Sequence, residues 1–434
     1  MTTQHSASRS TRSAAVIGAG QTGVTAALGL LDAGFDVTLY SDRDQRALRD
    51  DVPATGTALE FGETQQAEAA LGLDSYTGPA PPRPRRRAPG PPPPPPPPPS
   101  ISGLSRPQAG GMSSSTVLFD AEWTVAGQQD GGSFVARMAP EDESFPVFET
   151  YDLATQYQVM AGVAEATDLP VPRLRWLEND PGVLGTPFFV MDRVEGRVPT
   201  DNPPYVFVGW LFDATAEQRA RLTDATVEVI AKVHAIPDPV RRFPMLAGPG
   251  DALRRHVDAQ HAWYRWALAD DGYRIPIIER GFEWLAAHWP ADPGPDVLTW
   301  GDARPGNIIY HGFEPAAVLD WEMAAIGPRE LDVAWIIFLH RFFQDLATRF
   351  DQPGLPDFLR RSDVVAKYEA VSGHTVRDLD FYLVYTALRH AIVMARIKRR
   401  MIHFGEDTDT DDRDDYVMHR ASLEALLDGT YEWD

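Results

Sequence analysis

The residues of this chain best suited to chemistry lie in one short segment, 298–321, which reads LTWGDARPGNIIYHGFEPAAVLDW. It contains Asp302, then Asn307 five residues later and Asp320 eighteen residues after Asp302. Phosphoryl transfer needs such a set. One carboxylate orients an attacking hydroxyl and takes its proton, while an amide and a second carboxylate hold Mg²⁺ on the phosphates. The segment therefore predicts a phosphoryl-transfer centre.

Two apolar stretches in this segment, 307–310 and 316–319, predict a hairpin that positions these groups. Asp302 precedes the hairpin, Asn307 stands at its start and Asp320 at its end. The D-x-x-x-x-N spacing, followed by a metal-binding aspartate after a short hairpin, is the pattern of a kinase catalytic loop.

The rest of the chain after residue 105 predicts a kinase-like order of elements. Alternating stretches at 115–123 and 133–139 predict paired strands, and 188–194 predicts a short buried strand. A helix is expected over 152–167. The amphipathic pattern then predicts helices over 216–235, 251–269, 277–288, 329–348, 376–402 and 413–428. We therefore expect an α+β, bilobal fold, with a β-rich N-lobe at 105–195 and a helical C-lobe at 196–434.

Two motifs, WGDARPGN and VLDWE, resemble the HGDxxxxN and DxD motifs of aminoglycoside phosphotransferases and of choline-kinase-like small-molecule kinases. The resemblance extends to the kinase domains attached to some acyl-CoA dehydrogenases, and it covers 105–434. It implies a protein-kinase-like fold and transfer of the γ-phosphate of ATP, with Mg²⁺, to a hydroxyl of a small-molecule acceptor. Its supporting segments are GGMSSSTVLFDA, PVPRLRWLE, GTPFFVMDRVEG, VHAI and GPRELDVAW.

The resemblance also implies roles for individual residues. Asp302 is the expected catalytic base, and Asn307 and Asp320 are the expected Mg²⁺ ligands, with Glu322 as a further metal-site residue. Arg137 stands where such kinases carry a phosphate-binding lysine, and an arginine can grip phosphate with two hydrogen bonds. The alternative for Arg137 is an exposed strand residue.

Other nucleotide contacts are expected from a loop and a hinge. The loop residues are Gly110, Gly111, Ser113 and Ser114, whose glycines and hydroxyls can offer donors to phosphates. A plain hairpin turn is the alternative for this loop. The hinge, whose backbone would bind adenine, is expected at Met191, Asp192 and Val194.

Two departures keep an alternative function open. Trp300 stands where most of the family has histidine, and we expect it to pack structurally. Gln156 stands where a glutamate is usual, with Asp152 or Glu149 as possible substitutes. Together with the absence of lysine from residues 1–231, these changes allow a catalytically weak, pseudokinase-like nucleotide-binding protein.

A separate motif lies near the N-terminus, where Gly18, Gly20 and Gly23 form a G-x-G-x-x-G between an apolar strand and a helix. A second strand ends near Asp42, which completes a dinucleotide-binding context. Residues 14–78 resemble the FAD-binding start of the oxygenase subunit of styrene monooxygenases. Because one Rossmann-like βαβ unit buries little surface, we expect no FAD binding by this fragment. The alternative function for the whole chain is that of an FAD-dependent monooxygenase remnant fused to a kinase.

Composition sets the remaining expectations. Residues 1–13 are a polar, disordered tail, and 79–104, which include nine consecutive prolines, form a polyproline linker. The net charge is −22, and its excess lies in 107–434, which disfavours nucleic acid and anionic membranes as partners. The chain has no cysteine and no long apolar run, so we expect a cytoplasmic protein without disulfides.

Overall fold

The computed structural model describes residues 13–17, 36–40, 100–105, 115–125, 128–140, 145–268 and 272–433, and every structural statement below concerns these residues. The chain divides into two compact units. One comprises residues 1–95 with 180–186, and the other comprises 96–179 with 187–434.

The first unit contains two described strands, β1 (Ser13–Ile17) and β2 (Asp36–Tyr40). They pair in parallel, from Ser13 opposite Asp36 to Ile17 opposite Tyr40. This pairing matches the two strands expected on either side of the glycine motif. Gly18, Gly20, Gly23, Asp42 and the helix expected between the strands lie outside the described residues.

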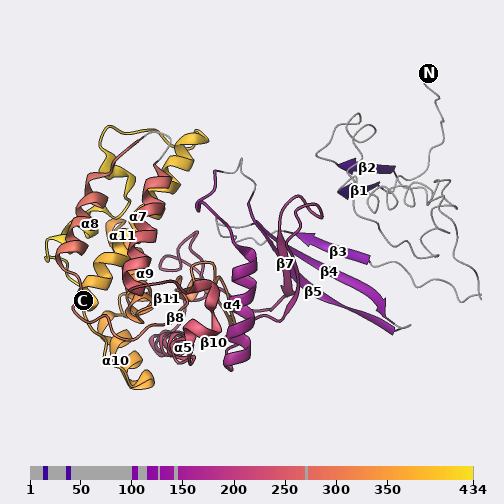
Figure 1. Ribbon diagram of the computed structural model, residues 1–434, viewed down its shortest axis with the longest axis horizontal. Helices are drawn as coiled ribbons and strands as arrows, with labels where there is room; N and C mark the ends of the chain where they lie inside the picture. Colours follow the sequence, from indigo (N-terminus) through magenta and orange to yellow (C-terminus); the bar gives the residue numbers. More distant parts are fainter. Residues whose placement is uncertain are drawn as a thin grey trace, which may run out of the picture. The chain divides into compact units, whose positions relative to one another are not determined.

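The second unit begins with a five-stranded antiparallel sheet in the order β3-β4-β5-β7-β6. Residues 100–104 fall in the segment expected as linker, but they belong to β3, which pairs with β4. Figure 1 shows this sheet beside the helix α4 (Leu153–Ala166). The strands are β3 (Ser100–Ser105), β4 (Ser115–Val125), β5 (Gln128–Met138), β6 (Leu174–Glu178) and β7 (Phe188–Asp192).

Local sequence explains how α4 forms and packs. The Asp152 carboxylate accepts a hydrogen bond from the Thr155 N–H at 2.9 Å, which caps the helix N-terminus. Val159 and Val163 are fully buried in the same core as Phe189 of β7. The sheet and α4 together form the β-rich lobe that the sequence predicts.

The helical lobe follows, and the helices α9 and α11 pack together at its centre (Figure 1). The helix predicted over 413–428 is divided in two, because the chain leaves the helical path at 417–419. The helix α10 was not predicted. The lobe contains α5 (Ala216–His234), α6 (Pro239–Arg242), η2 (Pro244–Leu246), α7 (Ala252–Ala267), α8 (Pro276–Ala287), α9 (Glu330–Arg349), α10 (Arg361–Ser372), α11 (Leu379–His403), η4 (Arg413–Tyr416) and α12 (Arg420–Leu427).

Two small antiparallel pairs lie between α8 and α9 in the sequence. The strands β9 (Ile308–His311) and β10 (Glu314–Val318) form the predicted hairpin. The strands β8 (Val297–Thr299) and β11 (Ala325–Gly327) pair on either side of it. The pairing of β8 with β11 therefore brings together the two ends of the segment that carries Asp302, Asn307 and Asp320. None of the described helices has the length and apolar character needed to cross a bilayer.

Candidate active site

Asp302 lies three residues after the end of β8, and three side chains hold its carboxylate. Asn307 Nδ2 donates to Oδ2 at 2.6 Å, and Trp335 Nε1 donates to Oδ1 at 2.6 Å. Arg304 Nε lies 3.1 Å from both oxygens. The Asp302 side chain keeps 15% of its surface exposed, so a substrate hydroxyl can still reach it. An anion fixed in this way is oriented before any ligand arrives.

The hairpin brings Asn307 and Asp320 together. The Leu319 N–H donates to the Asn307 carbonyl at 2.9 Å. Asp320 is the next residue, so this hydrogen bond holds its backbone close to that of Asn307. Asn307 Nδ2 donates to both the carboxylate and the carbonyl of Asp302, which leaves its Oδ1 as the group that could bind a cation. Asp320 has a left-handed backbone with φ +61°, which aspartate tolerates better than most residues.

Arg137 of β5 connects the β-rich lobe to this hairpin. Its Nη2 lies 3.2 Å from Asp320 Oδ1 and 3.6 Å from Glu322 Oε2. All three side chains are less than one-fifth exposed. The structure therefore brings together Arg137, Asp320 and Glu322, and it does not leave Arg137 as an exposed strand residue.

The side chain of Asp332 in α9 binds the loop that precedes Asp302. The Asp332 carboxylate accepts the Trp300 N–H at 2.7 Å and the Gly301 N–H at 2.8 Å. His234 Nε2 of α5 lies 3.0 Å from the same carboxylate, and Asp332 is completely buried. Two helices thus fix the backbone from which Asp302 projects.

Arg389 of α11 supports the same loop from another side. Its guanidinium lies 4.3 Å from the ring centroid of Trp335, and its Nη2 donates to the Gly301 carbonyl at 3.4 Å. Burial lowers the pKa of Arg389, although neighbouring Tyr385, Asp332 and Asp302 favour its charged form. Trp335 is therefore held on its face by Arg389 while its N–H binds Asp302.

Glycine is the only residue type that fits position 301 without distorting the backbone. Its φ is +91°, and a Cβ added there would lie 2.0 Å from the Met323 carbonyl oxygen. The conformation and the close approach both exclude a side chain.

The two departures from the usual motif are explained in part. Trp300 is fully buried, its ring centroid lies 5.8 Å from that of Trp321, and its Nε1 donates to the Leu319 carbonyl at 2.8 Å. This is the packing role expected for it. Gln156 is buried, and its Oε1 has no hydrogen-bond partner among the described residues. Asp152 caps α4, so its carboxylate is already used there.

The expected hinge lies at the end of β7. Met191 is buried, and the Asp192 carboxylate accepts two hydrogen bonds from Arg175, at 2.5 and 2.9 Å. The N–H groups of Asp192 and Arg193 donate to the carbonyls of Arg173 and Ser133, both at 2.9 Å. Val194, the third residue expected in the hinge, follows them. The expected phosphate loop, Gly110, Gly111, Ser113 and Ser114, lies outside the described residues.

Sequence reasoning missed Trp335 and Arg304, which bind the Asp302 carboxylate, and Asp332 and His234, which hold the loop before it. Arg304 Nη1 lies 2.5 Å from Asp201 Oδ2, so this arginine joins Asp201 to Asp302. Burial acts to lower the pKa of Arg304, but the carboxylates of Asp302 and Asp201 outweigh it and raise the pKa. The signal for Arg304 was its place inside GDARPGN. The others lie in VHAI and GPRELDVAW, which carry no spacing rule that links them to Asp302.

A β-rich lobe, a helical lobe and a catalytic-loop hairpin between them define a protein-kinase-like fold. Comparison with known proteins assigns the family. The Phosphotransferase enzyme family (APH) matches residues 106–370, more than half of the chain, and the chain belongs to this family. The family is one of phosphotransferase enzymes.

One solved structure supports the fold, and curated proteins match part of the sequence. A crystal structure from Ralstonia eutropha, described as a candidate aminoglycoside phosphotransferase, has a TM-score of 0.52 and 21% identity and covers 75% of this chain and 91% of that one. "Probable acyl-CoA dehydrogenase IBR3" of Arabidopsis thaliana is 25% identical over 57% of this chain. "Acyl-CoA dehydrogenase family member 11" of Gallus gallus is 30% identical over 48%. The matches span only 31% and 25% of these two relatives.

Proposed function

We propose that the protein transfers the γ-phosphoryl group of ATP, with Mg²⁺, to a hydroxyl of a small molecule. The observation that carries this proposal is the oriented carboxylate of Asp302, hydrogen-bonded to Asn307 on the hairpin that ends in Asp320. These are the groups that phosphoryl transfer requires, and they meet at one end of one hairpin.

Asp302 acts as the base in this proposal. Its carboxylate accepts the proton of the acceptor hydroxyl while the hydroxyl oxygen bonds to the γ-phosphorus. The bond from that phosphorus to the bridging oxygen breaks, and ADP leaves with the electron pair. The hydrogen bonds from Trp335 and Asn307 keep the carboxylate aimed at the hydroxyl. Positioning and charge stabilisation supply most of the rate in this class of reaction.

The donor set fits Mg²⁺. Asn307 Oδ1 and the carboxylates of Asp320 and Glu322 are hard oxygen donors, which this ion prefers. Among the described residues no three histidine, cysteine or acidic side chains converge as a ready metal cage. Mg²⁺ is usually held by one or two carboxylates together with water and phosphate oxygens, so the set suits it. When bound, the ion neutralises phosphate charge.

Arg137 and the hinge would bind the nucleotide. Arg137 now pairs with Asp320 and Glu322, and its planar guanidinium can turn to phosphate oxygens as those carboxylates bind the ion. In the hinge, Val194 is the proposed adenine contact, because the N–H groups of Asp192 and Arg193 already bind protein carbonyls. Gly110, Gly111, Ser113 and Ser114 remain the proposed phosphate loop.

A turnover screen tests the proposal. The full chain is incubated with ATP and Mg²⁺ and with pools of aminoglycosides, sugars, amino alcohols and hydroxyacyl thioesters, and phosphorylated product is followed by mass spectrometry. Product is expected with at least one pool, and Asp302→Ala should abolish it. Asp357→Asn is the matched control, because Asp357 pairs with Arg219 and not with the hairpin.

The pseudokinase-like alternative rests on Gln156, whose buried Oε1 lacks a partner where an ion-pairing glutamate is usual. Thermal stabilisation by ATP with no product from any pool would favour this alternative. Absence of both product and nucleotide binding would refute the proposed function itself.

A further inference from the structure

A second feature of the helical lobe is a cavity of about 330 Å³ where α5 and α10 end and α9 begins. Its volume lies at the lower end of the range for small-molecule sites. The polar groups that line it come from α5, from α10 and the residues after it, and from the residue before α9, and they are mostly hydrogen-bond donors. They are Lys232, His234, Arg329, Tyr368, Ser372 and His374.

Arg329 is the unusual member of this cavity. It is only 6% exposed, yet among the described residues its guanidinium has no side-chain hydrogen bond and no carboxylate within ion-pair distance. A guanidinium stays charged at any ordinary pH. A buried charge without a partner is costly, so buried charges are normally paired.

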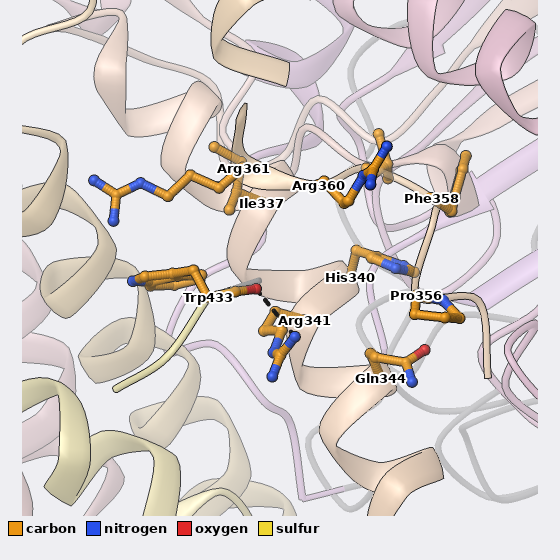
Figure 2. A pocket seen from close by; sticks show the side chains of 10 residues that line it. Ile337, His340, Arg341, Gln344, Pro356, Phe358, Arg360, Arg361 and Trp433 are labelled. Carbon is orange, nitrogen blue, oxygen red and sulfur yellow. Dashed lines mark hydrogen bonds between the residues drawn. The ribbon is translucent and has the colours of Figure 1, made fainter. Parts of the chain in front are cut away.

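A second cavity shows the usual arrangement for comparison (Figure 2). Three arginines line it, and each already holds an aspartate. Arg341 lies 3.0 Å from Asp345, Arg360 lies 2.9 Å from Asp363, and Arg361 lies 2.7 Å from Asp380. Figure 2 shows their guanidinium groups pointing in different directions. These arginines already have anionic partners, whereas Arg329 has none among the described residues.

The surroundings of Arg329 favour an oxyanion. His374 is close enough that the charge of Arg329, after the larger effect of burial, lowers the pKa of its imidazole. The Ser372 hydroxyl adds a further donor, whereas the Lys232 ammonium pairs with Asp168 at 2.8 Å and the Tyr368 hydroxyl is hydrogen-bonded to His234 Nδ1 at 2.8 Å. The one acidic lining residue, Glu228, pairs with Lys367 at 2.7 Å. The lining therefore presents more donors than acceptors to a ligand.

The same cavity touches the support of the catalytic loop. His234 lines it, and His234 Nε2 lies 3.0 Å from the Asp332 carboxylate. Asp332 in turn accepts the N–H groups of Trp300 and Gly301. Only two side chains thus separate the cavity from the backbone that carries Asp302.

We propose that this cavity is an effector site, in which Arg329 binds the oxyanion of a small metabolite and His234 passes the effect to the catalytic loop. The ligand is a phosphate ester or a carboxylate of a size that fits the cavity. This site is separate from the nucleotide site and does not depend on the proposed reaction.

Binding is tested on the full chain by calorimetry at constant ionic strength with glycerol 3-phosphate, glycerate and glycerol. One of the two anions should bind saturably, glycerol should not, and the anion that binds identifies the class. Arg329→Met should weaken that binding by about tenfold or more, the loss expected for a charge-assisted hydrogen bond. Arg360→Met, from the other cavity, and Arg137→Met, from the nucleotide site, should bind as the wild type does.

A second variant covers the case in which Arg329→Met does not fold. In His374→Glu a carboxylate would reach Arg329 from within the cavity, so this variant should melt at a higher temperature than the wild type and no longer bind the anion. Unchanged anion binding in Arg329→Met or in His374→Glu would overturn the proposed site, as would equal binding of glycerol.

The coupling has its own readout in amide hydrogen exchange. The bound anion should slow exchange of the Trp300 and Gly301 amides several-fold, because both amides donate to the Asp332 carboxylate, which His234 holds from the cavity side. Identical exchange rates with and without the anion would refute the coupling to the catalytic loop.

Discussion

The indole N–H of Trp335 donates a 2.6 Å hydrogen bond to Oδ1 of Asp302, from a helix that begins 28 residues after that aspartate. The opposite oxygen, Oδ2, accepts from Asn307. The direction of the carboxylate is therefore set by α9 as well as by its own loop. Because Arg389 covers the Trp335 ring, the indole has little freedom to turn away.

Trp335→Phe removes this hydrogen bond and keeps most of the ring volume. We expect kcat to fall about tenfold to a hundredfold with little change in the KM for ATP, because a hydrogen bond to a charged group contributes about 1.5–3 kcal/mol. Steady-state kinetics with whichever acceptor the screen identifies would measure both constants.

Trp263→Phe is the matched control for that prediction. Trp263 is also buried and donates to the Val147 carbonyl at 3.2 Å, away from Asp302. It should lose stability without losing kcat. Equal kcat values for wild type and Trp335→Phe would show that the indole does not orient the base.

Gly301→Ala should disrupt the catalytic loop. The new Cβ would lie 2.0 Å from the Met323 carbonyl oxygen in a backbone of φ +91°. We expect the free energy of unfolding to fall by more than about 2 kcal/mol, with loss of activity. Urea denaturation would measure this change.

Gly312→Ala separates the steric effect from the conformational one. Gly312 also has a positive φ, of +66°, but a Cβ there would meet nothing within 4 Å. Its cost should be only about 1 kcal/mol. If the two variants lost equal stability, contact with Met323 would not be the reason that Gly301 is required.

Stability should fall in mild acid because burial lowers the pKa of several imidazoles, His340 and His419 among them. Burial lowers the pKa of His340 and of His419 to about 4, from the ordinary histidine value of 6.5. Since the folded state favours the neutral form, the stabilisation is complete above pH 6.5 and is lost as the pH falls towards 4. Each imidazole should cost about 1.4 kcal/mol per pH unit within this window.

Urea titrations near pH 7 and near pH 5.5 would measure the difference in unfolding free energy. His340→Gln keeps groups that can bind Tyr205 and the Leu355 carbonyl, the two partners of His340. Its unfolding free energy should depend less on pH than that of the wild type. The same slope in both proteins would contradict a neutral, buried His340.

The sequence predicted those parts of the structure that nearby residues determine. The hairpin with Asp302, Asn307 and Asp320 follows from two apolar stretches within 24 positions, and the structure forms it. The helix predicted over 216–235 is α5, which the capping pair Thr215 and Gln218 begins. α10 escaped prediction because only two of its twelve residues, Val364 and Tyr368, are buried, which leaves a weak apolar pattern.

The support of Asp302 could not be predicted because it depends on tertiary contacts. Asp332 and His234 belong to α9 and α5, and only the packing of these helices brings both to the Trp300 and Gly301 amides. Arg329 illustrates the same limit. It lies next to Glu330 in the sequence, but only the tertiary structure shows that the Glu330 carboxylate accepts the Arg377 N–H, at 3.2 Å.

Binding of a non-hydrolysable ATP analogue tests the central claim most directly, because it needs no acceptor. Calorimetry on the full chain should show tighter binding with Mg²⁺ than without it. Asp320→Ala should lose that Mg²⁺-dependent gain, whereas Asp302→Ala should retain it, since Asp302 is proposed to contact the acceptor and not the ion. Binding that is unaffected by Mg²⁺, or a Mg²⁺ response in Asp320→Ala equal to that of the wild type, would contradict the account.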